Sequence, residues 1–346
     1  MLASKNSRIL LIGVLAVGLF FGYGKYKEYF GSNVPSNLND DMLLIPTGST
    51  YEDVVKILQD RGFVEDIDSF KSTASKMQYD KSSRIKAGGR FKLQPNWSNR
   101  DLIKHLRLGE QEPVKVVFNY ERMTENIAAK AAKTIEADSL TIYQKMNDTA
   151  FLDKLGYKPE ELMCIFLPNT YNMFWNIGAE KFLERMKKES DEFWNKNNRR
   201  EKAKALNMTP EQVYTLASIV EKESLNEEER PRIAGAYLNR LKIDMKLQAD
   251  PTCVFATKDF TTHRVTLYHT NFDSPFNTYK YKGLPPGPIS IASASSIDAV
   301  LNYEKHNYIY FCAKVDDSGT HAFAETFAQH NVNVDKYKEW MRTKGY

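Results

Sequence analysis

Residues 42–64, MLLIPTGSTYEDVVKILQDRGFV, indicate the fold class of this chain. Residues 42–45 are a short apolar run that predicts a strand, and residues 46–48 supply a turn. After the turn, apolar residues recur every three or four positions, which predicts an amphipathic helix capped by Ser49 or Thr50. A strand followed directly by a helix is the first sign of an α+β fold.

A second strand–helix unit follows at residues 87–109, AGGRFKLQPNWSNRDLIKHLRLG. Its strand is expected over residues 90–93, its helix is capped by Ser98 or Asn99, and the last residue is a helix-ending glycine. Two such units within about 70 residues predict a small α+β module, which we place at residues 42–112.

Residues 113–346 are expected to form one larger domain of mixed α+β structure. The domain begins with the strand VKVVFNY at residues 114–120, continues through several amphipathic helices, and closes with a hairpin over residues 308–323. The whole chain has 48 basic and 44 acidic residues, and this nearly balanced charge argues against a nucleic-acid-binding protein.

The N-terminal segment RILLIGVLAVGLFFGYGK has 16 uncharged, mostly apolar residues between Arg8 and Lys25. As a helix it would be about 24 Å long, slightly shorter than a hydrocarbon core of about 30 Å, and the flanking basic side chains can snorkel. The alternative is a cleaved signal peptide, but the sequence has no A-x-A cleavage site here. We therefore predict a short cytoplasmic N-terminus (residues 1–8), a single transmembrane helix (residues 9–24) and a linker (residues 25–41).

The stretch VYTLASIVEKES, residues 213–224, contains two glutamates with different expected surroundings. At about 100° per residue, Glu223 lies over the apolar stripe of a helix, Glu221 lies about 110° away on a wetter side, and Lys222 points to the opposite side. A carboxyl held against apolar groups has a raised pKa, which suits a general acid at neutral pH. The pattern favours Glu223 as a catalytic acid, and the alternative is a helix end that is simply exposed to water.

The motif NRLKIDMKLQADPT, residues 239–252, supplies polar side chains for a sugar. Asn239, Gln248 and Asp250 are candidates to bind hydroxyl or N-acetyl groups. Asp250 precedes a proline and is equally suited to a turn or a helix N-cap. Arg240 is expected to order the site through an ion pair rather than to touch the ligand.

The motif NTYKYKGLPPGPI, residues 277–289, places Asn277 and Tyr279 next to a stiff loop of prolines and glycines. These side chains are candidates for the wall of a sugar-binding groove, and the alternative is a plain rigid turn. His321 lies inside a strand beside a hairpin turn, where it contacts a saccharide or makes a structural hydrogen bond. The spacing of His321 and His330 fits no zinc motif, so we expect neither a metal nor a cofactor.

The motifs EKES, YLNRLKIDMKLQADPT, SPFNTYKYKGLPPGPIS and GTHAFAETFAQHN occur in this order. Together they resemble the MltG/YceG family of membrane-anchored endolytic murein transglycosylases, over most of the chain. The resemblance implies a LysM-like module at residues 42–112, a transglycosylase domain at residues 113–346, and catalysis by Glu223, the second acid of the E-K-E-[ST] motif. It also implies peptidoglycan glycan strands as the substrate, cell-wall synthesis proteins as partners, and a catalytic domain on the outer side of the cytoplasmic (inner) membrane.

The implied activity is non-hydrolytic cleavage of the bond between MurNAc and GlcNAc inside a glycan strand, which would terminate or trim nascent strands. Glu223 would protonate the glycosidic oxygen and then, as a base, take the C6 hydroxyl proton while a 1,6-anhydro ring closes; Arg240 and Glu221 would support it. Two alternatives stay open. One is a hydrolytic muramidase with Asp250 as its second carboxylate, and the other is a non-catalytic peptidoglycan-binding scaffold held by the membrane helix.

Overall fold

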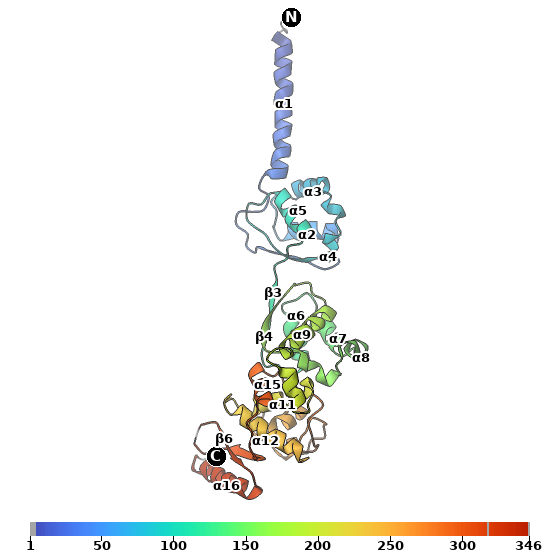
Figure 1. Cartoon of the computed structure of the whole chain (residues 1–346). Coiled ribbons are helices and arrows are strands. Elements are labelled where there is room, and N and C mark those ends of the chain that lie inside the picture. The colour runs from blue at the N-terminus through green and yellow to red at the C-terminus, as the bar shows by residue number, and fades with distance from the viewer. Residues whose placement is uncertain (1–4, 317, 345–346) are drawn as a thin grey trace. The chain divides into compact units, whose positions relative to one another are not determined.

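The structure is a computed structural model of the 346-residue chain that describes residues 5–316 and 318–344. The side chains of residues 5–12, 21 and 344 also lie outside the description. The chain divides into two compact units, each with its own hydrophobic core (Figure 1). The first comprises Met1–Lys115, Thr134–Glu136 and Asn172–Ile177, and the second comprises Val116–Lys133, Ala137–Tyr171 and Gly178–Tyr346.

The first unit contains a small antiparallel sheet with short helices around it. Its elements are α1 (Lys5–Phe30), β1 (Met42–Ile45), α2 (Tyr51–Asp60), α3 (Ile67–Lys76), η1 (Tyr79–Lys81), α4 (Arg84–Ala87), β2 (Gly89–Lys92) and α5 (Asn99–Leu108). In the β1–β2 pair, Leu43 lies opposite Phe91, and both side chains are buried in the core. Thr50 caps α2 and Ser98 caps α5 through their side-chain hydroxyls. Both predicted strand–helix units are confirmed.

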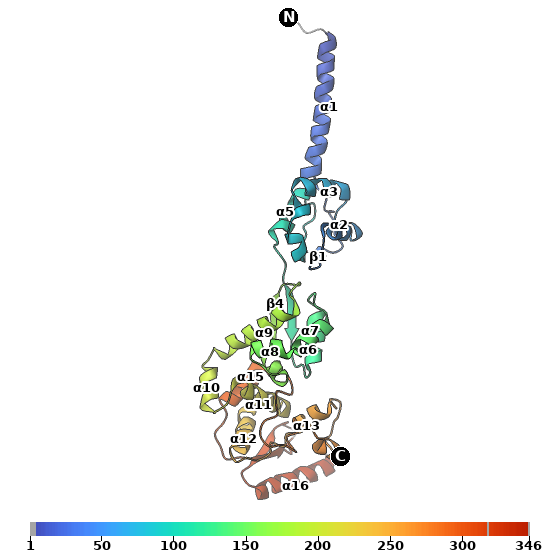
Figure 2. The same ribbon diagram turned by 90° about the vertical axis from the view of Figure 1, so that its right-hand side faces the viewer.

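The last turn of α1 packs against α3 and α5 (Figure 2). The backbone carbonyl of Glu28 accepts a hydrogen bond from Asn99 Nδ2 at 3.0 Å, and its carboxylate forms ion pairs with Lys25 and Lys76. A hydrogen bond from Ser72, together with those from the two lysines, lowers the pKa of Glu28 to about 2. These contacts attach the end of α1 to the first unit.

The segment that follows α1 is folded, so the predicted linker over residues 25–41 is wrong. Its first residues belong to α1, and Val34 is fully buried. The side-chain amide of Asn33 donates to Asn99 Oδ1 at 2.6 Å and accepts from the backbone N–H of Asp66 at 2.7 Å. A buried valine and an asparagine that joins two distant segments fix this stretch in the core of the unit.

None of the helices in the described part of the chain combines the length and the apolar composition that a membrane span requires. The predicted anchor covers residues 9–24, and the side chains of residues 9–12 and 21 lie outside the described set. The anchor therefore stays a prediction.

The rest of the chain is mostly helical, with two further pairs of short strands. Its elements are β3 (Val114–Phe118), α6 (Thr124–Ala132), α7 (Ser139–Met146), α8 (Thr149–Leu155), η2 (Pro159–Ile165), β4 (Asn169–Met173), α9 (Ala179–Trp194), α10 (Arg199–Ala205), α11 (Pro210–Glu223), α12 (Arg230–Lys242), α13 (Asp250–Thr257), α14 (Leu267–Asn271), α15 (Ala294–Leu301), β5 (Tyr310–Ala313), β6 (His321–Ala324) and α16 (Phe327–Lys344). β3 pairs with β4, and β5 pairs with β6 in antiparallel register. The predicted α+β class is confirmed.

The core of the second unit is built around α11, which contacts α12, α13 and α15 (Figure 2). Every residue from Val213 to Glu221 is buried. The helix starts with a capping box between Thr209 and Gln212 and has Pro210 in its first turn, two features that favour a helix start. α11 is therefore a central helix rather than a surface helix with one apolar face.

The loop before α15 is held by close packing and by polar side chains of α11. A Cβ on Gly287 would lie 1.8 Å from the carbonyl oxygen of Glu160, so only glycine fits there. Three backbone N–H groups of the loop donate to α11: Ile289 to Ser218 Oγ (3.1 Å), Ala292 to the Tyr214 hydroxyl (3.0 Å) and Ser293 to Glu221 Oε2 (2.6 Å). The loop is thus fixed against the helix that ends in Glu223.

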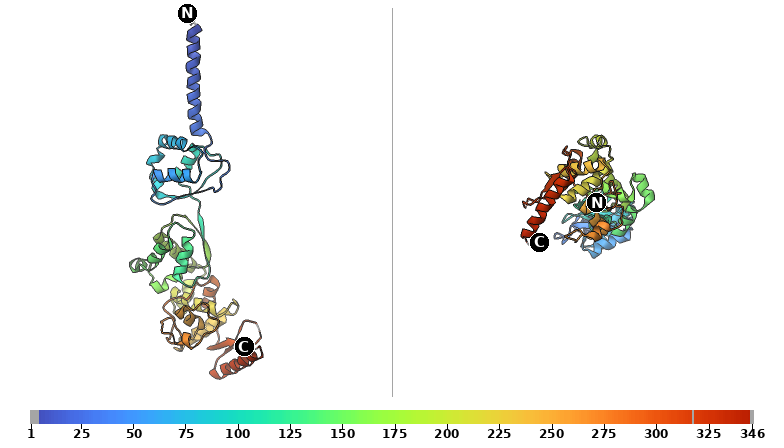
Figure 3. Two further views of the ribbon diagram at one scale, coloured as in Figure 1. Left: turned by 180° about the vertical axis from the view of Figure 1, so that it is seen from behind. Right: turned by 90° about the horizontal axis from the view of Figure 1, so that it is seen from below.

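The chain closes with the β5–β6 hairpin and with α16, which packs against both strands (Figure 3, in red). The hairpin places Phe311 opposite Phe323. It confirms the predicted hairpin, whereas α16 was not predicted.

Candidate active site

Glu223 is the last residue of α11, and the chain leaves the helix through Ser224 in an extended conformation. Its side chain is half-buried, and its Oε1 accepts a hydrogen bond from the hydroxyl of Tyr237 on α12 at 2.5 Å. Burial, together with the charge of Asp250, raises the pKa of the carboxyl from an ordinary 4.5 to about 7, although Tyr237 and Arg240 act in the opposite direction. Glu223 can therefore both donate and accept a proton near neutral pH, which is the property expected from its apolar surroundings.

The prediction that Glu221 lies on the wetter side of the helix is wrong. Its side chain is more deeply buried than that of Glu223, because α11 is packed on all sides and an argument from one apolar face does not apply to it. Its Oε2 accepts the backbone N–H of Ser293, the N-cap of α15. A carboxylate is favoured at a helix N-terminus, where the backbone N–H groups point outward. Glu221 thus connects α11 to α15.

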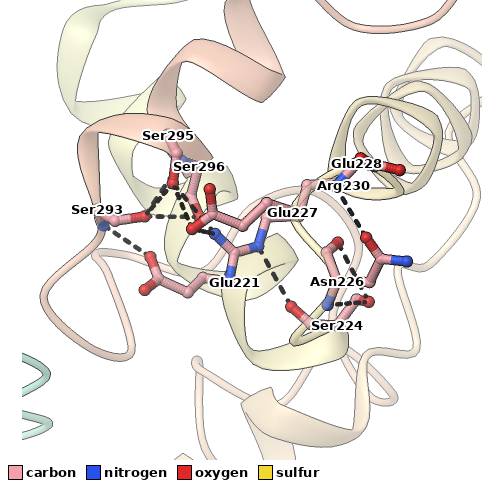
Figure 4. A network of polar contacts seen from close by, with 9 residues as sticks. All are labelled: Glu221, Ser224, Asn226, Glu227, Glu228, Arg230, Ser293, Ser295 and Ser296. Carbon is pink, nitrogen blue, oxygen red and sulfur yellow. Dashed lines mark hydrogen bonds and ion pairs between the residues drawn. The ribbon is translucent and has the colours of Figure 1, made fainter. Parts of the chain in front are cut away.

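A polar network surrounds the loop that leaves α11 (Figure 4). Arg230, at the start of α12, is buried; its Nε donates to the carbonyl of Ser224 at 3.2 Å. Its Nη1 contacts Glu227 Oε1 and Ser295 Oγ, each at 3.2 Å. Because this arginine joins the loop to the start of α15, it fixes the backbone directly after Glu223.

Arg240 holds the segments next to Tyr237 in place. Its Nε donates to the carbonyl of Ile309 at 2.6 Å, and its Nη1 donates to the carbonyl of Leu247. The guanidinium lies 6.0 Å from the centroid of the Tyr237 ring. The predicted ion pair of Arg240 is not found among the described residues, and the guanidinium donates to backbone carbonyls instead.

Asp250 is the first residue of α13, and its side chain is exposed. Its Oδ1 accepts a hydrogen bond from the hydroxyl of the half-buried Tyr279. The N-cap of α13 is Ala249, so Asp250 is not the cap. Because the charge of Asp250 raises the pKa of Glu223, the two carboxyl groups interact.

Glu223 and Asp250 line one pocket of about 240 Å³. The other lining residues are Arg122, Lys222, Pro251, Val254, Phe255, Phe260, Thr262 and Ile289. The sequence patterns did not identify the two cationic residues of this set, Arg122 and Lys222, as part of the site. Arg122 lies far from the EKES motif along the chain, and Lys222 was assigned to the side of the helix opposite Glu223.

The two asparagines predicted to bind sugar both make structural contacts. Asn277 is 0% exposed, and its Nδ2 donates to three backbone carbonyls at the C-terminal end of α14, so its predicted sugar contact is wrong. Asn239 Nδ2 donates to the carbonyls of His306 and Tyr308, which leaves Oδ1 as the amide atom that a ligand would have to use.

His321 and Gln248 occupy different kinds of position. His321 Nδ1 lies 2.7 Å from one carboxylate oxygen of the buried Glu229, and its backbone N–H donates to the other oxygen at 2.7 Å. This is the structural contact expected as one of its two roles, and a sugar would have to use Nε2. Gln248 is exposed, with a left-handed backbone (φ 47°), and its N–H donates to the Thr278 carbonyl at 3.1 Å. Its contact with a sugar stays a prediction.

The raised pKa of Glu223 makes a prediction about stability. Folding raises this pKa from 4.5 to about 7, so the associated stability is fully present below pH about 4.5 and is lost as the pH rises through about 7. Glu223→Gln keeps an acceptor for Tyr237 and removes the charge. In thermal or urea unfolding, the free energy of unfolding of the variant should rise relative to that of the wild type by about 1–3.5 kcal/mol between pH 4 and pH 8, the upper value being the full pKa shift at about 1.4 kcal/mol per pKa unit. A difference that does not change with pH would contradict the destabilised carboxylate.

A family model described as the YceG-like family matches residues 43–336. This range includes both strand–helix units and every residue that lines the pocket of Glu223. The chain belongs to the YceG-like family. The resemblance that the four motifs carry is thereby confirmed.

Two curated relatives of this YceG-like chain are named endolytic murein transglycosylase. The one from Streptococcus pneumoniae is 28% identical over 364 residues, which cover 96% of this chain and 64% of the relative. The one from Bacillus subtilis is 27% identical over 340 residues, covering 93% and 91%. The chain thus spans 64% of the length of the streptococcal relative. A crystal structure of a yceG-like protein from Listeria monocytogenes is 27% identical and matches with a TM-score of 0.56, covering 84% of this chain and 97% of that one.

Proposed function

We propose that this chain is a membrane-anchored endolytic lytic transglycosylase that cleaves the MurNAc–GlcNAc bond inside peptidoglycan glycan strands. The observation that carries the proposal is Glu223, a half-buried carboxyl with a pKa of about 7, held by Tyr237 and open to a pocket. The names of the two curated relatives support the same substrate and reaction. Cleavage inside strands would terminate or trim them during wall synthesis.

In the first step, protonated Glu223 donates its proton to the glycosidic oxygen, and the bond between C1 of MurNAc and that oxygen breaks. The carbonyl oxygen of the MurNAc N-acetyl group attacks C1 from the other side and stabilises the positive charge. Loss of the proton turns Glu223 into a carboxylate. The hydroxyl of Tyr237 then donates a hydrogen bond to this charged group. A donor already in place stabilises the carboxylate without rearrangement.

In the second step, the Glu223 carboxylate takes the proton of the C6 hydroxyl of the same MurNAc. The C6 oxygen attacks C1, the bond to the N-acetyl oxygen breaks, and a 1,6-anhydro ring forms. No water is consumed, and Glu223 ends the cycle protonated. A single carboxyl with a pKa near 7 is suited to both proton transfers, because neither form is strongly disfavoured at neutral pH.

Hydrolysis is the second candidate, and the observation that favours it is Asp250. Its carboxylate lines the same pocket as Glu223. An inverting hydrolase would use such a carboxylate as the base that activates water. Against this role, Asp250 already accepts a hydrogen bond from Tyr279, which weakens it as a base.

The experiment that tests the proposed function is product analysis after incubation with purified glycan strands. Mass spectrometry should find new MurNAc ends that are one water lighter than reducing ends. Early products should include strands of intermediate length, because cleavage inside a strand does not release disaccharides one at a time. Reducing ends would support the muramidase, and unchanged strands would support the non-catalytic scaffold.

Tyr237→Phe is expected to slow the reaction about tenfold or more. The variant keeps the buried ring but loses the hydrogen bond to Glu223, and a hydrogen bond to a charged group contributes about 1.5–3 kcal/mol. Because that bond lowers the pKa of Glu223, the pKa of the carboxyl should rise in the variant. The pH dependence of kcat/KM should accordingly shift to higher pH. A loss of rate with an unshifted pH profile would contradict the role of Tyr237.

We further propose that residues 9–24 anchor the chain in the cytoplasmic membrane with residues after about 30 outside. The support is the run of 16 uncharged, mostly apolar residues between Arg8 and Lys25. Lys188→Cys in the full chain with its 3 native cysteines replaced offers an exposed thiol on α9. A membrane-impermeant maleimide should label it in intact spheroplasts. Labelling only after lysis would contradict the topology.

A further inference from the structure

Two cations line the pocket of Glu223 without an acidic partner of their own. Arg122 and Lys222 are both half-buried. Within the described residues, neither has an ion pair or a hydrogen bond to a carboxylate, although acidic residues are close in the sequence. Glu121, next to Arg122, is engaged by Lys130 at 2.6 Å. The pocket therefore holds two cations and two carboxyl groups, and its net charge is positive while Glu223 is protonated.

Aromatic rings hold both cations in place. The guanidinium of Arg122 lies 4.8 Å from the ring centroid of Phe260, which also lines the pocket. Lys222 Nζ lies 5.6 Å from the ring centroid of Tyr120. Such contacts orient a cation without neutralising it, so the charge stays available to a ligand.

The backbone around Arg122 is fixed as well. The carbonyl of Glu121 accepts the N–H of Ile291 at 2.8 Å, in the loop that α11 holds. Ile289 of the same loop lines the pocket. Arg122 is thus attached to the same rigid support as Glu223, and its position does not depend on a mobile side chain alone.

Holding these two cations together is costly. Burial lowers the pKa of Arg122, and burial followed by the charge of Arg122 lowers the pKa of Lys222, although the charge of Glu221 acts in the opposite direction. In the proposed reaction, positive charge also develops on the sugar beside Glu223, and uncompensated cations nearby would oppose it. An anion on the substrate would remove both penalties.

We infer that Arg122 and Lys222 form a subsite for a carboxylate of the substrate, beside the MurNAc residue whose bond is cleaved. This inference rests on the proposed function. A guanidinium and an ammonium are the groups that bind carboxylates most strongly. The lactyl group of MurNAc can supply such a carboxylate in two ways. On a strand without peptides the lactyl carboxylate itself is free, and on a strand with peptides the attached stem peptide carries carboxylates. The subsite selects glycan strands that carry this charge over neutral strands of the same sugars.

The test compares four substrates with the full-length wild-type protein: strands with intact stem peptides, strands stripped of peptides by an amidase, and each of these after conversion of its carboxylates to methylamides. We expect kcat/KM to fall about tenfold or more on methylamidation of the preferred strand type. A larger fall for intact strands assigns the carboxylate to the stem peptide, and a larger fall for stripped strands assigns it to the lactyl group. Equal kcat/KM before and after methylamidation would overturn the subsite.

Variants separate the subsite from a general effect on the fold. In Arg122→Gln and Lys222→Met, the ratio of kcat/KM on charged strands to kcat/KM on methylamidated strands should fall to about one, whatever the absolute rate of each variant. Lys242→Met is the matched control, because Lys242 also faces an aromatic ring, Tyr303 at 5.4 Å, but does not line the pocket. It should keep the preference. Variants that lose activity equally on all four substrates would contradict the subsite.

The comparison of wild-type rates needs no variant, so the test holds even if a substitution unfolds the protein. The comparison also distinguishes a failure of the subsite from a failure of the proposed function. Cleavage of charged and neutral strands at equal rates would overturn only the subsite, whereas the absence of cleavage on all four would overturn the proposed function and the subsite with it.

Discussion

Glu223→Gln is expected to lower kcat by at least about 10²–10⁴-fold, the range that one general acid–base group contributes. The loss should lie at the upper end of that range or beyond it, because the same carboxyl performs both proton transfers. Glutamine has nearly the same shape and can still accept the hydrogen bond from Tyr237. KM should therefore change little, and kcat and kcat/KM should fall together, as for an interaction needed only in the transition state.

The matched control for this variant is Glu228→Gln. Glu228 is an exposed glutamate in the loop that follows α11, and its side chain has no part in the pocket. The same chemical change there should leave the rate within about twofold of wild type, as is usual for surface substitutions. An active Glu223→Gln variant would show that the catalytic acid lies elsewhere.

Glu221→Ala is expected to lower the stability of the protein by about 1–3 kcal/mol, because it leaves the N–H of Ser293 at the N-cap of α15 without its acceptor. The carboxylate is 6% exposed, so water cannot easily replace it. For a unit of this size the melting temperature should fall by about 2–4 °C per kcal/mol. Glu221→Gln keeps an acceptor oxygen and should recover part of the loss.

Substitution of the two glutamates should therefore have different effects: a loss of stability for Glu221 and a loss of activity for Glu223. Assayed well below its melting temperature, Glu221→Ala should retain most of the activity, whereas Glu223→Gln is folded and inactive. A Glu221→Ala variant with wild-type stability and no activity would assign the chemistry to Glu221 and would overturn the roles given to both residues.

The sequence predicted the parts of the fold that depend on local patterns. Thr50 and Ser98 cap the helices of the first unit, and the strands before them form where the apolar runs are. The hairpin near the C-terminus is also present. Local rules failed where a segment is held by distant ones: Asn33 and Val34 look like linker residues, but they are buried against parts of the chain that follow much later.

The site was predicted in part for the same reason. Glu223 is the last residue of an apolar helix, so its raised pKa could be anticipated from neighbouring residues. The burial of Glu221 could not be anticipated, because it depends on α15, which covers a side of the helix that has polar residues in the sequence. Asn277 appeared free to bind a sugar, yet its side-chain amide donates to backbone carbonyls at the C-terminal end of α14. Arg122 has no local signal at all, since only the fold brings it to the pocket.

In the proposed mechanism cleavage consumes no water, because Glu223 directs the C6 hydroxyl of the substrate to C1. The most direct measurement is the cleavage of purified glycan strands in water enriched in the heavy oxygen isotope, followed by mass spectrometry of the new MurNAc ends. We predict 1,6-anhydro ends that contain none of the isotope. New reducing ends that carry one heavy oxygen would show that water attacks C1, and would contradict this mechanism.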